Sequence, residues 1–242
     1  MSKKWLERTK LLIKEEGLQK LQESNVLVVG LGGVGSFAAE FLVRAGVGQM
    51  TIVDGDTVDI TNVNRQLPAL HSTVGKTKAE VVAERLFDVN PELRLTVKTE
   101  FLNPEQMAEV LDKEKFDYVL DCIDSVSPKL SLIKEARRRK IKIVSAMGAG
   151  GKTDPSKIMV RDISKTNNCF LAKQVRKRLK KESNIQKGVR CVFSTELQDE
   201  GSLKLTDGSN FKKSFYGTIS FIPAAFGLFA AAEVINYLIK KE

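Results

Sequence analysis

The sequence predicts an α/β protein: a doubly wound, mostly parallel sheet with a Rossmann-like nucleotide-binding half and a C-terminal extension. Two observations carry this prediction. Short apolar strands alternate with helical patterns through the first 150 residues, as in a parallel sheet covered by helices on both faces. A glycine-rich turn follows the first strand and opens the first of these helices, which is where such sheets bind nucleotides.

The predicted elements alternate regularly in the first half of the chain. The apolar strands are 25–29, 49–53, 93–98, 118–121 and 141–146. The helical patterns between them are 35–44, 76–89, 104–112 and 128–140. In the second half we expect a sharp glycine loop at 147–152, a short strand at 158–161, a basic helix at 171–181 and a mobile polar loop at 198–213.

The last segment, 219–239, is nearly all apolar and about long enough to span a bilayer. Pro223, Gly227 and Glu233 lie inside it, and its apolar residues are rich in alanine. We therefore expect a buried helix that closes the sheet, with membrane association as the less favoured alternative.

The glycine-rich turn has the spacing of a phosphate-binding turn. Gly30, Gly32 and Gly35 fit the pattern G-x-G-x-x-G. In that pattern the first glycine permits a tight turn, the second lets the backbone approach a phosphate, and the third lets the helix pack on the strand. The next strand is followed by Asp54, at the spacing of a carboxylate that holds ribose hydroxyls. Together these features predict a nucleotide site.

Cations beyond the turn decide between nucleotides. Arg65 lies in the loop T-N-V-N-R-Q, and Lys76 and Lys78 open the next helix. An enzyme that expels pyrophosphate needs positive charge where the leaving group gains negative charge, whereas hydride transfer to nicotinamide does not. The sequence therefore favours ATP over NAD. The alternative function is that of an NAD-dependent oxidoreductase. The alternative for Lys76 and Lys78 is that they are simply solvated lysines in the first turn of a helix.

A further acid follows the fourth strand. Ligands bind at the carboxyl ends of parallel strands, and this rule places Asp124 on the same rim as Gly30 and Asp54. A hard carboxylate oxygen at this position suits Mg²⁺ bound with ATP. The alternative is that Asp124 caps the helix that follows it.

The charge balance indicates an anionic partner. The net charge is +9, and such an excess favours a polyanion larger than one nucleotide over a merely basic surface. Two dense cation runs, 137–140 and 171–181, are the candidate contacts with a phosphate backbone. The N-terminus has no apolar signal core, so we expect a cytoplasmic protein.

Zinc and nucleophilic chemistry have little support. The three cysteines form no C-x-x-C pair, and His71 is the only histidine. We interpret Cys122, Cys169 and Cys191 as small buried hydrophobes. Cys191 is the candidate reactive thiol to follow, because it precedes V-F-S-T-E in a predicted strand.

Six motifs in a fixed order carry a family resemblance: G-x-G-G-V-G-S, I-V-D-x-D, T-N-x-N-R-Q, V-G-x-x-K-A-E, D-x-I-D-S and F-x-P-x-x-x-G. From about residue 8 to residue 240 the chain resembles the ThiF/MoeB/HesA superfamily of adenylating enzymes, a group similar to ubiquitin-activating enzymes. The resemblance implies a symmetric homodimer. It also implies one adenylating domain over 1–242, with a nucleotide-binding half at 1–150 and a substrate and dimer half at 151–242.

The resemblance assigns roles residue by residue. The nucleotide-binding candidates are Arg8, Gly30, Gly32, Gly33, Gly35, Asp54, Asp56 and Gln66. Asn62, Arg65 and Lys78 are expected to contact phosphates at the adenylation centre. Asp124 is expected to coordinate Mg²⁺. Arg8 corresponds loosely to an arginine that reaches the phosphates of the neighbouring subunit.

Three segments favour the branch of this superfamily that modifies tRNA: D-C-I-D-S-V-S-P-K, G-A-G-G before D-P, and C-V-F-S-T-E. The implied reaction is ATP-dependent dehydration of threonylcarbamoyladenosine in tRNA. The substrate carboxylate attacks the α-phosphate of ATP, and the carbamoyl group then closes onto the resulting acyl-adenylate. The implied partners are tRNA, a second copy of the chain and a sulfur-relay protein. The alternative is adenylation of the C-terminal glycine of a ubiquitin-like sulfur carrier.

Overall fold

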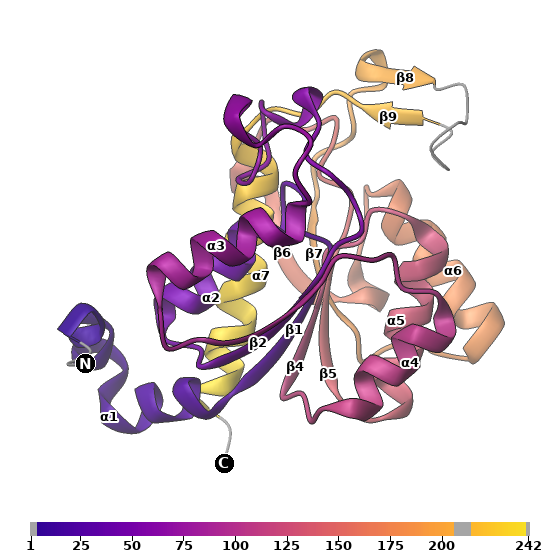
Figure 1. Cartoon of the computed structure of the whole chain (residues 1–242). Coiled ribbons are helices and arrows are strands. Elements are labelled where there is room, and N and C mark those ends of the chain that lie inside the picture. The colour runs from indigo at the N-terminus through magenta and orange to yellow at the C-terminus, as the bar shows by residue number, and fades with distance from the viewer. Residues whose placement is uncertain (1–3, 206–213, 241–242) are drawn as a thin grey trace.

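A computed structural model describes residues 4–205 and 214–240. A seven-stranded sheet crosses the molecule in the order β3-β2-β1-β4-β5-β7-β6 (Figure 1). Its strands are β1 (Asn25–Val29), β2 (Gln49–Val53), β3 (Arg94–Lys98), β4 (Tyr118–Asp121), β5 (Lys142–Ala146), β6 (Ile158–Asp162) and β7 (Arg190–Ser194). Every neighbouring pair is parallel except β6 with β7. The predicted doubly wound, mostly parallel sheet is confirmed.

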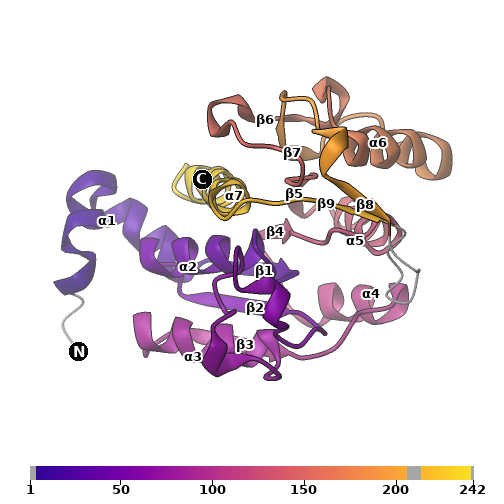
Figure 2. The same cartoon turned by 90° about the horizontal axis from the view of Figure 1, so that it is seen from above.

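Helices cover both faces of the sheet, as Figure 2 shows from above. They are α1 (Glu7–Glu23), α2 (Gly35–Ala45), α3 (Lys78–Val89), α4 (Pro104–Lys113), α5 (Val126–Arg138), α6 (Phe170–Ser183) and α7 (Phe221–Leu238). One apolar core lies between the sheet and α2, α3 and α7, and a second lies between the sheet and α4, α5 and α6. β1 is buried along its whole length, because helices cover both of its faces.

The predicted strands and helices begin and end within two residues of the observed ones. The largest difference is the helix predicted at 128–140, which forms α5 at Val126–Arg138. α1 is an addition to the predicted elements. Few residues of α1 are buried, and charged residues surround them. Lys14 interrupts its helical geometry with a φ of 65°. No regular apolar stripe therefore marks this helix in the sequence.

The predicted loop at 198–213 is wrong for the part that the structure describes. A short 3-10 helix at Glu200–Ser202 leads into β8 (Leu203–Leu205), which pairs antiparallel with β9 (Ser214–Tyr216). Residues 206–213 lie outside the described part. Every residue of β8 is exposed, so no alternation of buried and exposed positions identifies the strand from sequence.

The apolar segment at the end of the chain forms α7 and packs inside the molecule, as predicted. Its buried side chains include Ile222, Phe226, Ala230, Val234 and Leu238. A Cβ on Gly227 would lie 2.5 Å from the Val34 carbonyl oxygen, so only glycine lets α7 approach the start of α2 this closely. Among the described helices, α7 is the one long and apolar enough to cross a bilayer. Here those apolar side chains fill the core beside α2.

Candidate nucleotide-binding site

The carboxyl ends of β1, β2 and β4 meet at one edge of the sheet, where the glycine-rich turn leads into α2 (Figure 1). Gly30 has a φ of 91° and donates its N–H to the Val53 carbonyl at 2.8 Å. A Cβ on Gly30 would lie 2.8 Å from the Cys122 carbonyl oxygen, and one on Gly35 would lie 1.7 Å from the Gly30 carbonyl oxygen. Close backbone contacts, with the segment after β4 for Gly30 and inside the turn for Gly35, therefore require glycine at both positions.

The two central glycines of the turn have different surroundings. A Cβ on Gly33 would lie 2.9 Å from the Pro223 side chain, so Gly33 lets the start of α7 close on the turn. A Cβ on Gly32 would meet only the Gln66 side chain, at 3.6 Å or more. Among the described residues, the buried Oε1 atom of Gln66 has no hydrogen-bond partner. Such an acceptor destabilises the fold until a donor reaches it, so the space beside Gly32 fits a hydrogen-bonding ligand.

Asp54 follows β2 and directs its carboxylate into the turn. Its Oδ2 accepts the Leu31 N–H at 2.6 Å, and its Oδ1 accepts the Asp56 N–H at 2.8 Å. Burial raises the pKa of Asp54, against the opposing effects of these two donors and of the Lys78 charge. The carboxylate thus fixes the shape of the turn, and each oxygen keeps a further lone pair for a ligand.

Two of the predicted cations lie at this edge. Lys78 is buried and donates to Asp56 Oδ2 at 2.8 Å, so the alternative of a solvated lysine is wrong for Lys78. It holds for Lys76, which is exposed. Arg65 is half-buried, and its guanidinium donates to the Thr61 carbonyl at 2.8 Å. The Arg65 carbonyl lies against the glycine turn, 3.0 Å from a Cβ placed on Gly33.

The other polar residue of this loop is held by local bonds. Asn62 ends a 3-10 helix (Ile60–Asn62) and is buried. Its Oδ1 accepts the Asp59 N–H at 3.3 Å, while Asp59 accepts the Thr61 N–H at 2.8 Å. This reciprocal cap fixes the loop that carries Arg65. The amide oxygen of Asn62 is therefore engaged within the loop.

Asp124 is exposed on the loop between β4 and α5. Burial lowers the pKa of Arg65, and the nearby Asp124 charge opposes that shift, so the acid and the cation act on one another across the edge. The N-cap of α5 is Ser125, so the alternative in which Asp124 caps this helix is wrong. Within the described ranges, no three His, Cys, Asp or Glu side chains gather to hold a metal. A magnesium ion at Asp124 would take its other ligands from phosphate and water.

A buried ion pair lies beneath the loop that carries Asp124. Lys129 and Asp121 are both fully buried, and Lys129 Nζ donates to Asp121 Oδ2 at 2.8 Å. Lys129 also donates to the Ala146 carbonyl at 2.9 Å, and Ser145 Oγ donates to Asp121 Oδ2 at 2.6 Å. The remaining oxygen, Oδ1, accepts the Ile123 N–H at 3.1 Å. One carboxylate therefore joins β4, α5 and β5 to the loop.

A pocket of about 690 Å³ opens between Asn64, on the loop that carries Arg65, and segments of the second half of the chain. It is lined by Asn64, Gly151, Lys152, Thr153, Glu196, Leu197, Asp199, Ser202, Gly217, Thr218, Ile219 and Ser220. Asn64 Nδ2 donates to the Thr218 carbonyl at 2.9 Å, which ties the Arg65 loop to the opposite wall. Glu196 accepts the N–H groups of Thr153 and Asp154, both at 3.0 Å. None of these lining residues is among the predicted site residues, although the glycine loop and the C-V-F-S-T-E segment mark this wall in the sequence.

Arg8 lies away from these groups. It is exposed on α1, and the nearby Trp5 lines a hollow of about 190 Å³ together with Gly48 and Arg94, at the amino ends of β2 and β3. Ligands of parallel sheets bind at the carboxyl ends, so we assign the site to the larger pocket and the turn. Among the predicted site residues, Arg8 is thus the one that lies away from the site edge within a single copy of the chain.

The basic runs are partly neutralised. Arg139 is bonded to Asp112 and Glu135, and Arg138 to Glu135 as well. In α6, Arg176 donates to the Thr166 carbonyl at 2.8 Å. The cations of 137–140 are therefore less available to a polyanion than the sequence predicts. The lysines of α6 that are exposed are Lys173, Lys177, Lys180 and Lys181.

The cysteines are consistent with small hydrophobes. Cys169 and Cys191 are buried. Burial raises the pKa of the Cys122 and Cys191 thiols, so both stay protonated near neutral pH. The candidate role of Cys191 as a reactive thiol is therefore unsupported. His71 is exposed in a short 3-10 helix.

The fold and this edge define a nucleotide-binding α/β protein with a glycine-rich turn after its first strand. The chain belongs to the ThiF family, whose model matches residues 6–242. It is 42% identical to the tRNA threonylcarbamoyladenosine dehydratase of Bacillus subtilis, over 96% of this chain and 94% of that protein.

A solved structure and a more distant relative extend the comparison. The crystal structure of E. coli tRNA N6-threonylcarbamoyladenosine dehydratase, TcdA, in complex with ATP matches with a TM-score of 0.87 and 41% identity, over 96% of this chain and 92% of that one. The molybdopterin-synthase adenylyltransferase of Haemophilus influenzae is 33% identical, over only 62% of this chain and 64% of that protein. The similarity to the dehydratases therefore extends over the second half of the chain, which supplies most of the pocket lining.

We predict that Lys129→Met destabilises the protein by about 3–5 kcal/mol, because it leaves the Asp121 carboxylate buried without its cation. The measurement is urea unfolding followed by circular dichroism. The control is Lys113→Met, which changes a lysine that is 69% exposed on α4 and should shift stability by less than about 0.5 kcal/mol. Equal midpoints for the two variants would contradict the prediction.

Proposed function

We propose that the protein is an ATP-dependent adenylating enzyme that dehydrates threonylcarbamoyladenosine in tRNA. The observation that carries the proposal is the arrangement at this edge: the Lys78 charge acts on Asp54, and the backbone of Arg65 lies against Gly33 of the glycine-rich turn. The neighbouring Asn64 lines a pocket large enough for a nucleoside. The names of the dehydratase relatives, which match nearly the whole chain, support the same activity. The compartment we propose is the cytoplasm.

In this proposal the half at 1–150 holds ATP. The backbone of the turn at Gly30, Gly32, Gly33 and Gly35 approaches the nucleotide, and Gln66 offers its unpaired acceptor. Asp54 holds the ribose with its free lone pairs. Lys78, kept in place by Asp56, and Arg65, kept in place by its own loop, stabilise the charge that develops on the leaving pyrophosphate. Asn62 fixes the loop that carries Arg65, and its proposed role is to contact the same phosphates of ATP.

Mg²⁺ is the proposed metal. Asp124 would hold it, since its carboxylate is exposed beside Arg65 and hard oxygen ligands suit this ion. When bound, Mg²⁺ neutralises charge on the phosphates. The protein's own part is to fix the loop through the hydrogen bond that the Ile123 N–H donates to Asp121 Oδ1.

The proposed reaction has two steps. An oxygen of the substrate carboxylate attacks the α-phosphorus of ATP, the bond to the pyrophosphate oxygen breaks, and an acyl-adenylate forms. The carbamoyl group of the same residue then attacks the activated carbonyl carbon, and AMP leaves with the carboxylate oxygen. Both reacting groups belong to one residue, so the ring closes without a second substrate. No histidine is required, which suits a chain whose only histidine, His71, is exposed in a short 3-10 helix.

The half at 151–242 supplies most of the pocket and is the proposed substrate half. A ubiquitin-like sulfur carrier as the substrate is less favoured, because the adenylyltransferase relative matches a much smaller part of the chain than the dehydratases do. A stable complex with such a carrier would instead support that alternative. A sulfur-relay protein stays a proposed partner without an assigned surface.

We expect tRNA incubated with the protein, ATP and Mg²⁺ to yield a cyclised nucleoside that has lost one water, detected by mass spectrometry. Arg65→Ala and Lys78→Ala should each lose about 2–4 kcal/mol of transition-state stabilisation, measured as ATP–pyrophosphate exchange. Lys76→Ala, which changes the exposed lysine two residues before Lys78, should stay near the parental rate. Near-normal exchange by either of the first two variants would rule out the assigned adenylation centre.

We propose that tRNA binds along α6. Lys173, Lys177 and Lys180 lie on one face at helical spacing and are exposed, whereas Arg176 is held by Thr166. Replacing these three lysines by alanine should flatten the plot of log affinity against log salt by about two units, since each phosphate contact contributes about 0.7–0.9. ATP binding should not change. A parental salt slope in the triple variant would mean that this face is only solvated.

We propose a two-fold homodimer that buries more than about 1,600 Å². Leu11 and Leu12 of α1 are 69% and 82% exposed, and Arg8 on the same helix reaches a glycine turn only if it enters a second copy. Light scattering at micromolar concentration should give twice the mass of the chain. Leu12→Asp should shift the protein toward monomer, while Leu205→Asp, on the far hairpin, should not. A parental protein that is monomeric would refute this arrangement.

A further inference from the structure

Three lysines are buried among the described residues, and one of them lacks an acid partner. Lys78 donates to Asp56 Oδ2 at 2.8 Å, and Lys129 donates to Asp121 Oδ2 at 2.8 Å. Lys152 is only 3% exposed, yet within the described part of the chain no carboxylate lies within 4 Å of its ammonium group. Burial of a cation without a counter-ion is costly, so this lysine is the one whose partner is missing.

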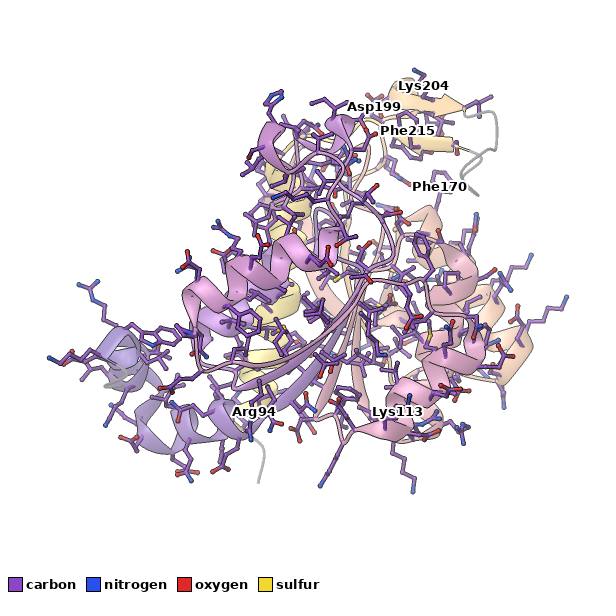
Figure 3. All side chains as sticks on the ribbon, in the orientation of Figure 1. Arg94, Lys113, Phe170, Asp199, Lys204 and Phe215 are labelled. Carbon is purple, nitrogen blue, oxygen red and sulfur yellow. The ribbon has the colours of Figure 1, made fainter. Side chains whose placement is uncertain are left out.

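Lys152 lies at the edge of the sheet that carries the nucleotide turn. It follows the glycine loop that leaves β5, and its neighbour in the pocket wall, Glu196, follows β7. β4, β5 and β7 are parallel neighbours, so their carboxyl ends continue the edge that begins at the turn. Asp199, which lines the same pocket, lies at the end of the molecule opposite Arg94, the first residue of β3 (Figure 3). Lys152 is thus placed where parallel sheets bind their ligands.

Backbone hydrogen bonds hold Lys152 in the pocket wall. Gly151, with a φ of 69°, donates its N–H to the Gly217 carbonyl at 2.8 Å, and its own carbonyl accepts the Asp199 N–H at 2.9 Å. The Lys152 ammonium group donates to the Glu196 carbonyl, which is its one hydrogen-bond partner among the described residues. A lysine ammonium has three N–H donors, so two are left for a ligand in the pocket.

The acid nearest to Lys152 along the wall is held by other donors. The two oxygens of the Glu196 carboxylate accept the backbone N–H groups of Thr153 and Asp154, both at 3.0 Å. Burial lowers the pKa of Lys152, and the Cys169 and Glu196 groups oppose that shift without cancelling it. The pocket wall therefore holds a positive charge that a bound anion would neutralise.

We propose that Lys152 binds the carboxylate of the substrate, the group that is adenylated. This role rests on the proposed function and specifies which group of the substrate the pocket recognises. Threonylcarbamoyladenosine carries one carboxylate and an unmodified adenosine carries none, so a buried cation distinguishes the two. The ion pair holds one carboxylate oxygen and leaves the other to attack the α-phosphorus of ATP. Asn64, which precedes the proposed phosphate ligand Arg65, lines the same pocket, so the pocket connects the carboxylate with the phosphates.

The test measures tRNA binding without ATP, so that no turnover occurs. Three forms of one tRNA are compared: one with threonylcarbamoyladenosine, one with the methylamide of its carboxylate, and one with unmodified adenosine. The parental protein should bind the acid form roughly tenfold more tightly than the amide form, which is the effect of one hydrogen bond between charged groups. Lys152→Met should bind the acid and amide forms equally and the unmodified tRNA as the parent does. Lys157→Met, which changes a lysine that is 52% exposed further along the same segment, is the matched control and should keep the preference.

Two further measurements separate binding from folding. Lys152→Met should keep a urea midpoint close to the parental one, because no buried carboxylate loses its cation. Lys152→Gln keeps a donor for the Glu196 carbonyl and removes the charge, so it should also lose the preference for the acid form. With ATP and Mg²⁺, both variants should cyclise the acid form with a KM raised roughly tenfold and with kcat little changed, since a contact of the bound substrate has been removed.

Three outcomes would overturn this role of Lys152. The first is a parental protein that binds the acid and amide forms equally, and the second is a parental preference in either neutral variant. The third is an equal loss of affinity for all three tRNA forms, which would mean that Lys152 contacts a backbone phosphate instead. If the parental protein forms no cyclised nucleoside from the acid form with ATP, the proposed function itself fails, whatever the binding measurements give.

Discussion

The edge that carries the site depends on one buried carboxylate. Asp121 ends β4 and accepts hydrogen bonds from Lys129 of α5, from Ser145 of β5 and from the backbone of Ile123. A fully buried ion pair contributes little net stability, because the desolvation of both charges offsets their attraction. Its effect here is geometric. It fixes the Cys122 carbonyl against which Gly30 turns, and with it the loop that presents Asp124.

Much of the fold was predictable because its causes are local. A parallel strand buried on both faces, such as β1, appears in the sequence as an uninterrupted apolar run, and the helices between such strands have a clear period. The site turn was predictable for a similar reason, because Gly35 is required by a backbone contact with Gly30 inside one strand–turn–helix unit. The hairpin of β8 and β9 has no such mark, since its first strand is wholly exposed.

The parts of the site that could not be predicted depend on contacts between distant segments. Sequence spacing places Arg176 among the free cations of α6, but its guanidinium turns back to Thr166. The run at 137–140 loses Arg139 in the same way, to an acid on α4. Arginine is the cation most suited to such bidentate, partly buried bonds, whereas lysine keeps its charge in water. Counting basic residues therefore overstates the positive surface, and the exposed lysines of α6 give the better measure.

The nucleotide turn and the pocket are not independent parts. Asn64 adjoins Arg65 and holds the Thr218 carbonyl on the opposite wall. The chain then enters α7, where Pro223 lies against Gly33. Any displacement of the turn therefore moves both walls of the pocket through one hydrogen bond and one packing contact. The proposed reaction requires this coupling, because the α-phosphorus must lie within reach of the substrate carboxylate, and small misplacements are costly to the rate.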